Sequence, residues 1–457
     1  MKYLLLPVVA FAVFGVSAEI RITAPAEGET MPLLTDAQKA YVRMDRATRR
    51  VKFAEAKFRK SEMGMPAERV PGEKEDRKPY WPKTVRLAWE GADGDCRVKV
   101  VDVKKKEVVF EGTAKDHVDI DNLEIAADYE WVVADGKSSA KGTFKTEDMA
   151  PRLLRFPGVN NVRDLGGRIG LGGKRIRQGL VIRSAGLNDN AGKEYYTMEE
   201  LRSSGKQDEI AKATESTKVR LEQLLKWQAD PKTMDLEDEE YKEWCTRHRG
   251  EPPTKFLSSR VRRAKDAVQN GVNPKIPKGP KKGKNRVEGA NGEYIRARFG
   301  IKSDIDLRSD GECWGMEGSP LGPTVTWYHY SSSAYGGMQS SFGRTQFTKV
   351  FKVFLDEKNY PIDFHCIAGQ DRTGAVAFIL EGLLGVDEDV LYLDWETTGF
   401  WNRGNSFCHE RLFDGLVRGF NKSYPGKSLA EACEAYVLSL GFTADDIAKF
   451  RKIMIED

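Results

Sequence analysis

One cysteine of the chain stands in the stretch DFHCIAGQDRTG, residues 363 to 374. Cys366 directly follows a histidine, and five residues separate it from Arg372, after which a long apolar stretch begins. A loop between a strand and a helix can turn its backbone N–H groups inward, and the helix N-terminus adds partial positive charge. Arg372 adds a planar guanidinium that suits two phosphate oxygens. The spacing therefore predicts a socket for a phosphate dianion, with the Cys366 thiol at its base.

The same surroundings should make Cys366 a nucleophile. A free thiol titrates near about 8.5, and a helix N-terminus with a guanidinium lowers that pKa markedly. The thiolate would attack phosphorus, expel an alcohol or phenol, and leave a cysteinyl phosphate that water then hydrolyses. The hydroxyl of Thr373 can hydrogen-bond the sulfur. The residues expected to surround the phosphate are Ile367, Ala368, Gly369, Gln370, Thr373 and Gly374.

His365 precedes the nucleophile on a strand and should point away from it, because successive side chains of a strand alternate between faces. We expect His365 and Arg308 to support the site, and no catalytic base is needed for a thiol that is already ionised. The leaving group does need an acid. Two carboxyls could supply it: Asp371 inside the loop, and Asp306 in IDLRSDGE at the end of a neighbouring strand. A carboxyl beside a dianionic ester should have a raised pKa, so Asp371 is slightly favoured over Asp306, and each could instead be a structural carboxylate paired with arginine.

The elements around this loop predict an α/β phosphate-site domain over residues 151–457, with a central sheet flanked by helices. SDIDL and TVTWYHYSS are typical of buried strands, and a helix should lead into the strand before Cys366. The stretch AVAFILEGLLGV is apolar enough for a helix in the centre of such a domain. The glycine-rich start of the domain predicts a meander of loops and short strands.

A charged insertion interrupts this pattern at about residues 188–293. Around DEIAKATESTKVRLEQLLKW we expect an amphipathic helix. Four apolar residues fall near one face of it: Ile210, Leu221, Leu224 and Leu225. The run from Lys255 to Arg286 is rich in Lys and Arg, and such a run can bind an anionic surface. Because Pro and Gly interrupt the run, a solvated, partly mobile segment is the favoured interpretation.

Residues 19–149 predict an all-β sandwich, because TVRLAWEG and CRVKVVDV alternate with period two and further short strands follow. Trp89 on an early strand, with NLEIAADYEWVV and a closing TFKT, resembles a fibronectin type III module. In that family Leu123 and Tyr129 would lie at the corner where a tyrosine braces the sandwich. An Ala-, Arg- and Lys-rich stretch near residues 36–61 predicts a helical excursion inside or beside the sandwich. A spacer or interaction role is expected for this part.

Residues 1–18 combine a basic start, an apolar run and small residues, which is typical of a signal peptide cut after Ala18. The run is too short to span a bilayer of about 30 Å comfortably, so a membrane anchor is the less favoured alternative. We expect an exported protein, periplasmic or secreted, with no later transmembrane segment.

The composition excludes several classes of partner and cofactor. A net charge of +4 is too small to favour a nucleic-acid partner. The six cysteines are too few and too scattered for a disulfide scaffold or a zinc site of paired cysteines. We therefore expect no metal and no other cofactor.

HCIAGQDRTG matches the Cys-x5-Arg signature of the protein tyrosine phosphatase superfamily, and the chain resembles its bacterial branch of secreted tyrosine and phosphoinositide phosphatases. The resemblance covers residues 156–457 apart from the insertion, and implies a cysteine-dependent phosphomonoester hydrolase, most simply a protein tyrosine phosphatase, with dual specificity possible in that superfamily. Gln370 stands where the branch usually has lysine, which weakens the expectation of multiply charged lipid substrates. The mobile Trp-Pro-Asp loop of eukaryotic members is absent. Four further motifs follow the order of the family: NVRDLGG, IRSAGL, GIKSDIDLRSDGE and LDWETT.

Other functions stay open from the sequence. The substrate could be a phosphorylated protein, a phosphoinositide or an inositol phosphate, and the socket could bind phosphate with weak turnover. A polyanion-binding, adhesin-like protein would instead depend on the β module and the basic run. A rhodanese-type sulfurtransferase also uses a loop cysteine, but the Arg372-Thr373-Gly374 ending favours phosphate.

Overall fold

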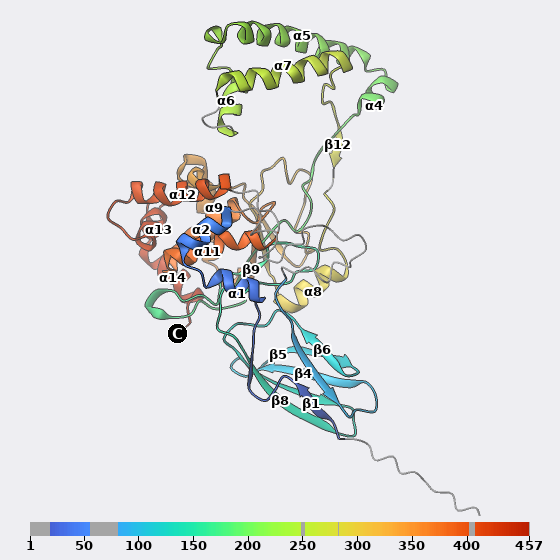
Figure 1. Ribbon diagram of the computed structural model, residues 1–457, viewed down its shortest axis with the longest axis vertical. Coiled ribbons are helices and arrows are strands. Elements are labelled where there is room, and N and C mark those ends of the chain that lie inside the picture. The colour runs from blue at the N-terminus through green and yellow to red at the C-terminus, as the bar shows by residue number, and fades with distance from the viewer. Residues whose placement is uncertain (1–18, 55–80, 248–251, 282, 402–406, 457) are drawn as a thin grey trace, which may run out of the picture. The chain divides into compact units, whose positions relative to one another are not determined.

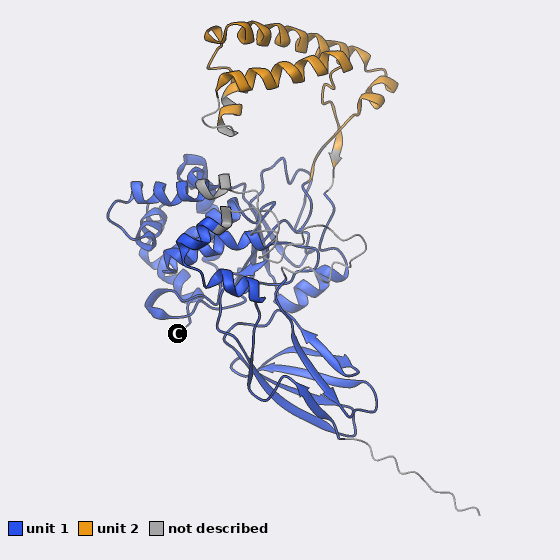
Figure 2. Cartoon of the chain, in the orientation of Figure 1, with its two compact units in different colours: residues 1–190, 283–457 blue, residues 191–282 orange. Residues whose placement is uncertain are grey.

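In a computed structural model the chain forms two compact units, one of residues 1–190 with 283–457 and one of residues 191–282 (Figure 2). The structure describes residues 19–54, 81–247, 252–281, 283–401 and 407–456. The predicted signal peptide lies outside the described residues. In those described ranges, no helix is both long enough and apolar enough to cross a membrane.

The N-terminal part of the first unit is a β-sandwich (Figure 1). One sheet has the strand order β1-β3-β6 and the other the order β2-β8-β7-β4-β5. Inward-facing residues alternate along β3, β4 and β7 as the period-two pattern predicts, for example Val85, Leu87 and Trp89 of β3. The hydroxyl of Tyr129 accepts a hydrogen bond from the Glu124 N–H at 2.9 Å. The strands are β1 (Arg21–Ala24), β2 (Glu29–Met31), β3 (Val85–Glu90), β4 (Cys96–Asp102), β5 (Glu107–Ala114), β6 (His117–Ile120), β7 (Asp128–Ala134) and β8 (Ser139–Thr146).

The helical excursion between β2 and β3 consists of α1 (Asp36–Val42) and α2 (Arg46–Ala54), and its remainder lies outside the described residues. Lys39 and Arg43 pair with Glu147, directly after β8, at 3.7 and 3.3 Å, but the excursion also packs on the α/β domain, which was not expected. Tyr41 belongs to the apolar core of the α/β domain, and its hydroxyl donates to Glu396 of that domain at 3.1 Å. Arg49 of α2 pairs with the same carboxylate at 2.8 Å, and both side chains are 3% exposed. A buried arginine needs a carboxylate partner, and that partner comes from a segment almost 350 residues away.

The α/β domain is built on a five-stranded sheet of order β14-β13-β15-β10-β9. Neighbouring strands are parallel except β9 and β10, which are antiparallel. The predicted strands SDIDL and TVTWYHYSS are confirmed as β13 and β14, and the glycine-rich start contributes β9 and β10. The strands are β9 (Arg163–Asp164), β10 (Val181–Ser184), β13 (Ser303–Asp306), β14 (Thr326–His329) and β15 (Ile362–His365).

The two faces of this sheet are chemically different. Ile305, Ile362 and Phe364 lie in the main apolar core. Their neighbours along the strands point to the other face, where the register places Asp304 beside Asp363. The same register places Asp306 beside His365. A buried polar row therefore runs along one face of the sheet, directly before the carboxyl ends of β13 and β15.

Helices complete the domain around the sheet. Every residue of α10 from Thr373 to Leu383 is buried, which confirms the predicted central helix. Helix α9 leads by a short turn into β15, also as predicted. The helices are α8 (Ala290–Phe299), α9 (Ser341–Phe354), α10 (Arg372–Leu383), α11 (Glu388–Glu396), α12 (Phe407–Ser423), α13 (Leu429–Leu438) and α14 (Ala444–Met454).

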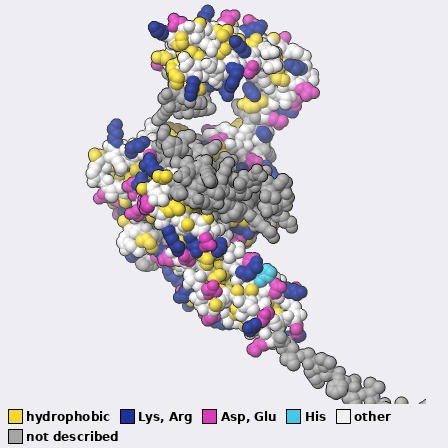
Figure 3. Space-filling model, in the orientation of Figure 1, with side chains coloured by type: hydrophobic (Ala, Val, Ile, Leu, Met, Phe, Trp, Pro, Cys, Tyr) yellow, Lys and Arg dark blue, Asp and Glu magenta, His cyan; other side chains and the backbone are white. Residues whose placement is uncertain are grey.

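The second unit is a helical structure on a two-stranded antiparallel ribbon. The amphipathic helix is confirmed as α5, with Leu224 buried, but Leu225 is exposed and Trp227 takes the inward position instead. The basic run is not simply a solvated segment, because α7 packs its apolar face on α5. Basic and acidic side chains are interspersed over the face of this unit seen in Figure 3. Its elements are β11 (Gly192–Tyr195), α4 (Met198–Ser203), α5 (Gln207–Ala229), α6 (Glu239–Arg247), α7 (Pro253–Asn270) and β12 (Pro277–Lys281).

Candidate active site

The loop from Cys366 to Asp371 connects β15 to α10 at the carboxyl edge of the sheet. Its carbonyl groups bind to the surrounding protein. The Ile367 carbonyl accepts from the Gly186 N–H at 3.1 Å, and the Ala368 carbonyl accepts from Asn161 Nδ2 at 2.8 Å. Because a carbonyl and the N–H of the next residue point in opposite directions across a planar peptide, the N–H groups that follow face the inside of the loop.

Gly369 is required by the tight course of this loop. Its φ is +65°, and a Cβ there would lie 2.4 Å from the carbonyl oxygen of Ser184. The carbonyl of Gly369 accepts from a terminal guanidinium nitrogen of Arg183 at 2.7 Å. The loop is thus held from outside against β10, as an anion socket requires.

Cys366 lies at the base of the loop and is 2% exposed. Burial opposes ionisation of its thiol, but the charge of Arg372 and hydrogen bonds from Thr373 outweigh it and lower the pKa. Thr373 is fully buried beneath the loop. The arrangement favours a thiolate facing the same enclosed space as the loop N–H groups.

Arg372 is held by Glu312, a carboxylate to which the sequence analysis assigns no role. Its two terminal nitrogens donate to Glu312, one at 2.6 Å and the other at 3.2 Å. Burial opposes ionisation of Glu312, yet hydrogen bonds from Arg372 and Ser309 lower its pKa to about 2. The bidentate pair fixes the plane of the guanidinium at the mouth of the loop.

His365 lies on the polar face of the sheet, away from the socket, and is fully buried. Its Nε2 is 3.0 Å from Asp304, and its Nδ1 is 3.2 Å from the Cys366 carbonyl oxygen. Burial alone would lower its pKa, but Asp306 and Asp304 raise it to about 9. The imidazolium can therefore donate to the backbone of the nucleophile from behind.

The structure does not give Asp306 the raised pKa that the sequence led us to expect. Burial raises it, but His365 and Arg308 outweigh burial and lower it below the usual range. Arg308 donates to both carboxylate oxygens at 2.6 to 3.1 Å, and the Cys313 thiol lies 3.3 Å away. Asp306 thus has the surroundings of a structural carboxylate paired with arginine.

Asp371 is the last residue before α10 and is half-buried. The hydroxyl of Tyr335 donates to its Oδ1. Burial and the charge of Asp371 raise the pKa of Tyr335, so this tyrosine is a neutral donor. Asp371 is thereby oriented at the edge of the socket, next to Arg372 in the chain.

A buried charge cluster lies behind the loop. Asp394 of α11 is surrounded by Arg163, Arg168 and Arg183, and these side chains are at most 2% exposed. Burial opposes ionisation of Asp394, but the three guanidinium groups lower its pKa. Because Arg183 also binds the Gly369 carbonyl, Asp394 fixes one wall of the loop through it.

The sequence brought Cys366, Arg372, Thr373 and Asp371 together in one contiguous stretch, and the structure places them in one loop. It gave no role to Glu312, Tyr335 or Asp394. Glu312 and Asp394 lie within the quoted motifs GIKSDIDLRSDGE and LDWETT, which was the available signal. Tyr335 lies outside those motifs, and its contact depends on packing.

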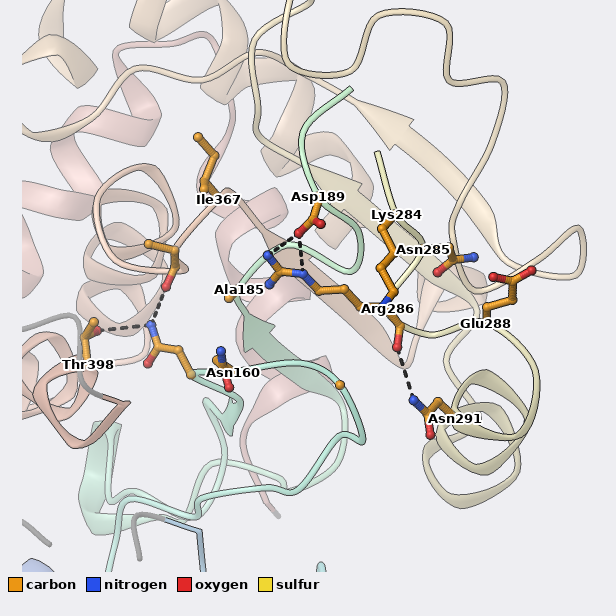
Figure 4. Close-up of a pocket in the computed structure, with 13 residues that line it drawn as sticks. Asn160, Ala185, Asp189, Lys284, Asn285, Arg286, Glu288, Asn291, Ile367 and Thr398 are labelled. Atoms are coloured by element: carbon orange, nitrogen blue, oxygen red, sulfur yellow. Dashed lines mark hydrogen bonds and ion pairs between the residues drawn. The ribbon is translucent and has the colours of Figure 1, made fainter. Parts of the chain in front are cut away.

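A pocket of about 560 Å³ borders the loop at Ile367 and Ala368 (Figure 4). It extends from the loop toward the segment 284–291, which re-enters the domain after the helical unit. No aromatic side chain is among its lining residues. The other lining residues are Gly158, Asn160, Asn161, Ala185, Asp189, Lys284, Asn285, Arg286, Glu288, Asn291 and Thr398.

A comparison with known protein families agrees with this site. The sequence model of the tyrosine phosphatase family matches residues 154–222 and 284–456, more than half of the chain. Among solved structures, the core catalytic domain of the PP-IP phosphatase SIW14 from S. cerevisiae, in complex with citrate, matches at 16% identity with a TM-score of 0.21. That match covers 29% of this chain and 80% of the yeast domain. No curated protein matches the chain.

The loop and the family match define a cysteine-based phosphatase, an enzyme that hydrolyses phosphoric monoesters. The chain belongs to the tyrosine phosphatase family.

Proposed function

We propose that the enzyme is a protein tyrosine phosphatase that acts through a cysteinyl-phosphate intermediate. The observation that supports this proposal most strongly is the buried Cys366 thiol with its lowered pKa. It lies beneath inward-facing N–H groups and beside Arg372. The thiolate forms an S–P bond while the P–O bond to the leaving group breaks. Water then attacks phosphorus, the S–P bond breaks, and inorganic phosphate leaves. Arg372 and the loop N–H groups stabilise the charge on the transferring phosphoryl oxygens.

Asp371 is the proposed general acid. Its carboxyl lies at the edge of the socket, whereas both oxygens of Asp306 are engaged by Arg308. In the first step Asp371 would donate its proton to the leaving oxygen, and in the second step it would accept a proton from water. Arg308 and His365 support the loop from the neighbouring strand.

The test of this function is hydrolysis of para-nitrophenyl phosphate and phosphotyrosyl peptides in metal-free buffer. Cys366→Ser should reduce turnover to background, because a hydroxyl at this position does not ionise near neutral pH. The matched control is Cys433→Ser, since burial raises the pKa of that thiol and it lies in α13. Equal activity in wild type and Cys366→Ser would exclude the mechanism.

An inositol phosphate or phosphoinositide is the second candidate substrate. The polar lining of the pocket beside the loop favours a ligand with hydroxyl or charged groups over a purely aromatic one. Turnover of an inositol phosphate well above that of a phosphotyrosyl peptide would assign this substrate. Slow release of phosphate with tight binding of either ligand would instead indicate a phosphate-recognition module.

For the N-terminal region we propose a fibronectin type III-like module in an exported protein. The strand orders of the two sheets and the Tyr129 hydrogen bond near Leu123 support the module. A mature N-terminus at Glu19, found by N-terminal sequencing of the exported protein, would support export.

We also propose that the basic helix α7 binds an anionic surface. Arg262, Arg263 and Lys265 are exposed on it. Replacing these three residues with glutamate should abolish retention on vesicles that contain anionic lipid. Unchanged retention would exclude this helix as the binding surface.

A further inference from the structure

The pocket beside the catalytic loop lies off the carboxyl end of β10, the strand adjacent to β15. Residues 187–189 continue from β10, and residues 284–286 run antiparallel to them through hydrogen bonds of 2.9 to 3.0 Å. The segment 284–286 therefore lies beside the extension of β10, and it lines the same pocket as the loop residues Ile367 and Ala368. A second group of a substrate bound at the loop can reach it through this pocket.

Lys284 and Arg286 alternate along this segment and both line the pocket (Figure 4). Arg286 is tied to the site, because its guanidinium donates to Asp189 at 2.6 and 2.9 Å. The Arg286 N–H also donates to the Leu187 carbonyl at 3.0 Å. Within the described part of the chain, no ion pair or side-chain hydrogen bond engages Lys284. Its ammonium is therefore available to a ligand.

Two carboxylates also line the pocket and must be accounted for. The charge of Asp189 is compensated by Arg286. Glu288 is exposed and lies beyond Arg286 as seen from Ile367 (Figure 4). The side chain of Asn160 adds an uncharged polar group near the loop. Lys284 is thus an exposed cation of the pocket wall, and it lacks the carboxylate partner that Arg286 has in Asp189.

We propose that this pocket is a subsite for a second anionic group of the substrate, with Lys284 as the specificity-determining residue. The inference rests on the proposed phosphatase function and narrows its substrates to phosphomonoesters with another carboxylate or phosphate nearby. Gln370 carries no charge, so the second cation comes from the segment after the helical unit and not from this position of the catalytic loop. The recognised chemistry is the same for an acidic phosphotyrosyl peptide and for a bisphosphorylated polyol.

Binding is measured by calorimetry in the Cys366→Ser background, where ligands are not consumed. One arm compares a phosphotyrosyl peptide flanked by aspartates with the same peptide carrying asparagines. The other arm compares an inositol bisphosphate with an inositol monophosphate. In at least one arm the more anionic ligand should bind more tightly. Lys284→Met should raise the Kd of that ligand by about fivefold and leave the Kd of the less anionic ligand unchanged.

Lys284→Arg should preserve the preference, and Lys302→Met is the matched control, since Lys302 is exposed and lies before β13 at the opposite edge of the sheet. Asp189→Asn should strengthen binding of the preferred ligand, because it releases the Arg286 guanidinium. No effect of Lys284→Met in either arm would overturn the subsite.

The two proposals fail separately. Absence of para-nitrophenyl phosphate turnover in wild type would count against the phosphatase function, while a Lys284-dependent preference in binding would still support the subsite. Normal turnover of para-nitrophenyl phosphate without a Lys284-dependent binding preference would support the phosphatase function and exclude the subsite.

Discussion

Two neighbouring parallel strands, β13 and β15, end at the same edge of the sheet, yet they contribute different groups to the site. After β15 come inward-facing N–H groups, Arg372 and the start of α10. The end of β13 and the segment after it supply two carboxylates, Asp306 and Glu312, with pKa values below their usual range. Asp306 binds Arg308 and faces His365, whereas Glu312 binds Arg372 of the socket. The β13 side therefore holds the socket guanidinium in its orientation.

The largest effect should come from removing the planar cation of the β15 loop. Arg372→Lys should lower kcat/KM for an aryl phosphate by about 10³-fold, because an ammonium does not bind two phosphoryl oxygens in one plane. It should also raise the pKa of Cys366 if the Lys ammonium lies farther from the sulfur. The pH dependence of Cys366 alkylation by iodoacetamide measures that pKa.

The control for this change is Arg344→Lys, since Arg344 lies in α9 and contacts Ser439, away from the loop. An activity of Arg372→Lys close to wild type would mean that the loop N–H groups alone carry the phosphoryl charge.

The next effect separates the carboxyls of the two segments. Asp371→Asn should lower kcat by about 10²-fold on phenyl phosphate, whose poor leaving group needs a proton, and far less on para-nitrophenyl phosphate. Asp306→Asn should instead destabilise the fold by about 3 kcal/mol, because it leaves the buried Arg308 guanidinium without its carboxylate partner. Steady-state kinetics and denaturant unfolding measure the two outcomes.

If the two variants showed the opposite effects, Asp306 and not Asp371 would be the general acid. Leaving-group dependence in Asp306→Asn, with none in Asp371→Asn, would make the β13 carboxylate the acid.

A smaller effect is expected where the two segments touch, at the pair of Arg372 and Glu312. Glu312→Gln should lower kcat/KM by about tenfold and weaken inhibition by orthovanadate, because the guanidinium loses its charged partner. The pKa of Glu312 is depressed to about 2, so its contribution to stability is present above its ordinary pKa and is lost as the pH falls toward 2. Acid unfolding of the variant should therefore show a shallower slope in this window. A slope identical to that of wild type would contradict the ion pair.

The contrast between the loop after β15 and the segment after β13 also explains which site residues could be predicted from the sequence. The phosphate socket is contiguous, so Cys366, Thr373 and Arg372 were recognisable from spacing alone. The side chains that orient the socket come from other segments, and Glu312 and Tyr335 are assigned by contacts that no local pattern encodes. For Asp306 the sequence left both an acid and an arginine-paired carboxylate open, because its pKa depends on the packing of Arg308 and His365 around it.

The same limit applied to the fold. Strands and the central helix follow from local periodicity, and they were predicted. The placement of α1 and α2 depends on the long-range partner of a buried arginine, Arg49, and was not. Helix α7 was underestimated because its apolar face is interrupted by many charged residues and gains stability only from packing on α5.

The smallest effect is expected from the charge that joins the two segments at the back of the loop. The pKa of His365 is raised to about 9, above its ordinary value, so the stabilisation is complete below that ordinary value and is lost as the pH rises through about 9. Denaturant unfolding of wild type should show this loss between about pH 7 and pH 10, and His365→Gln should show less of it. The buried carboxyls Asp363 and Glu381, with pKa values raised to about 7 and about 8, also reduce stability as the pH rises from their ordinary pKa to these raised values, but the difference between the two proteins isolates the histidine. Parallel stability curves for wild type and His365→Gln would mean that the imidazole is neutral, and that the β13 carboxylates hold the β15 loop without a cation between them.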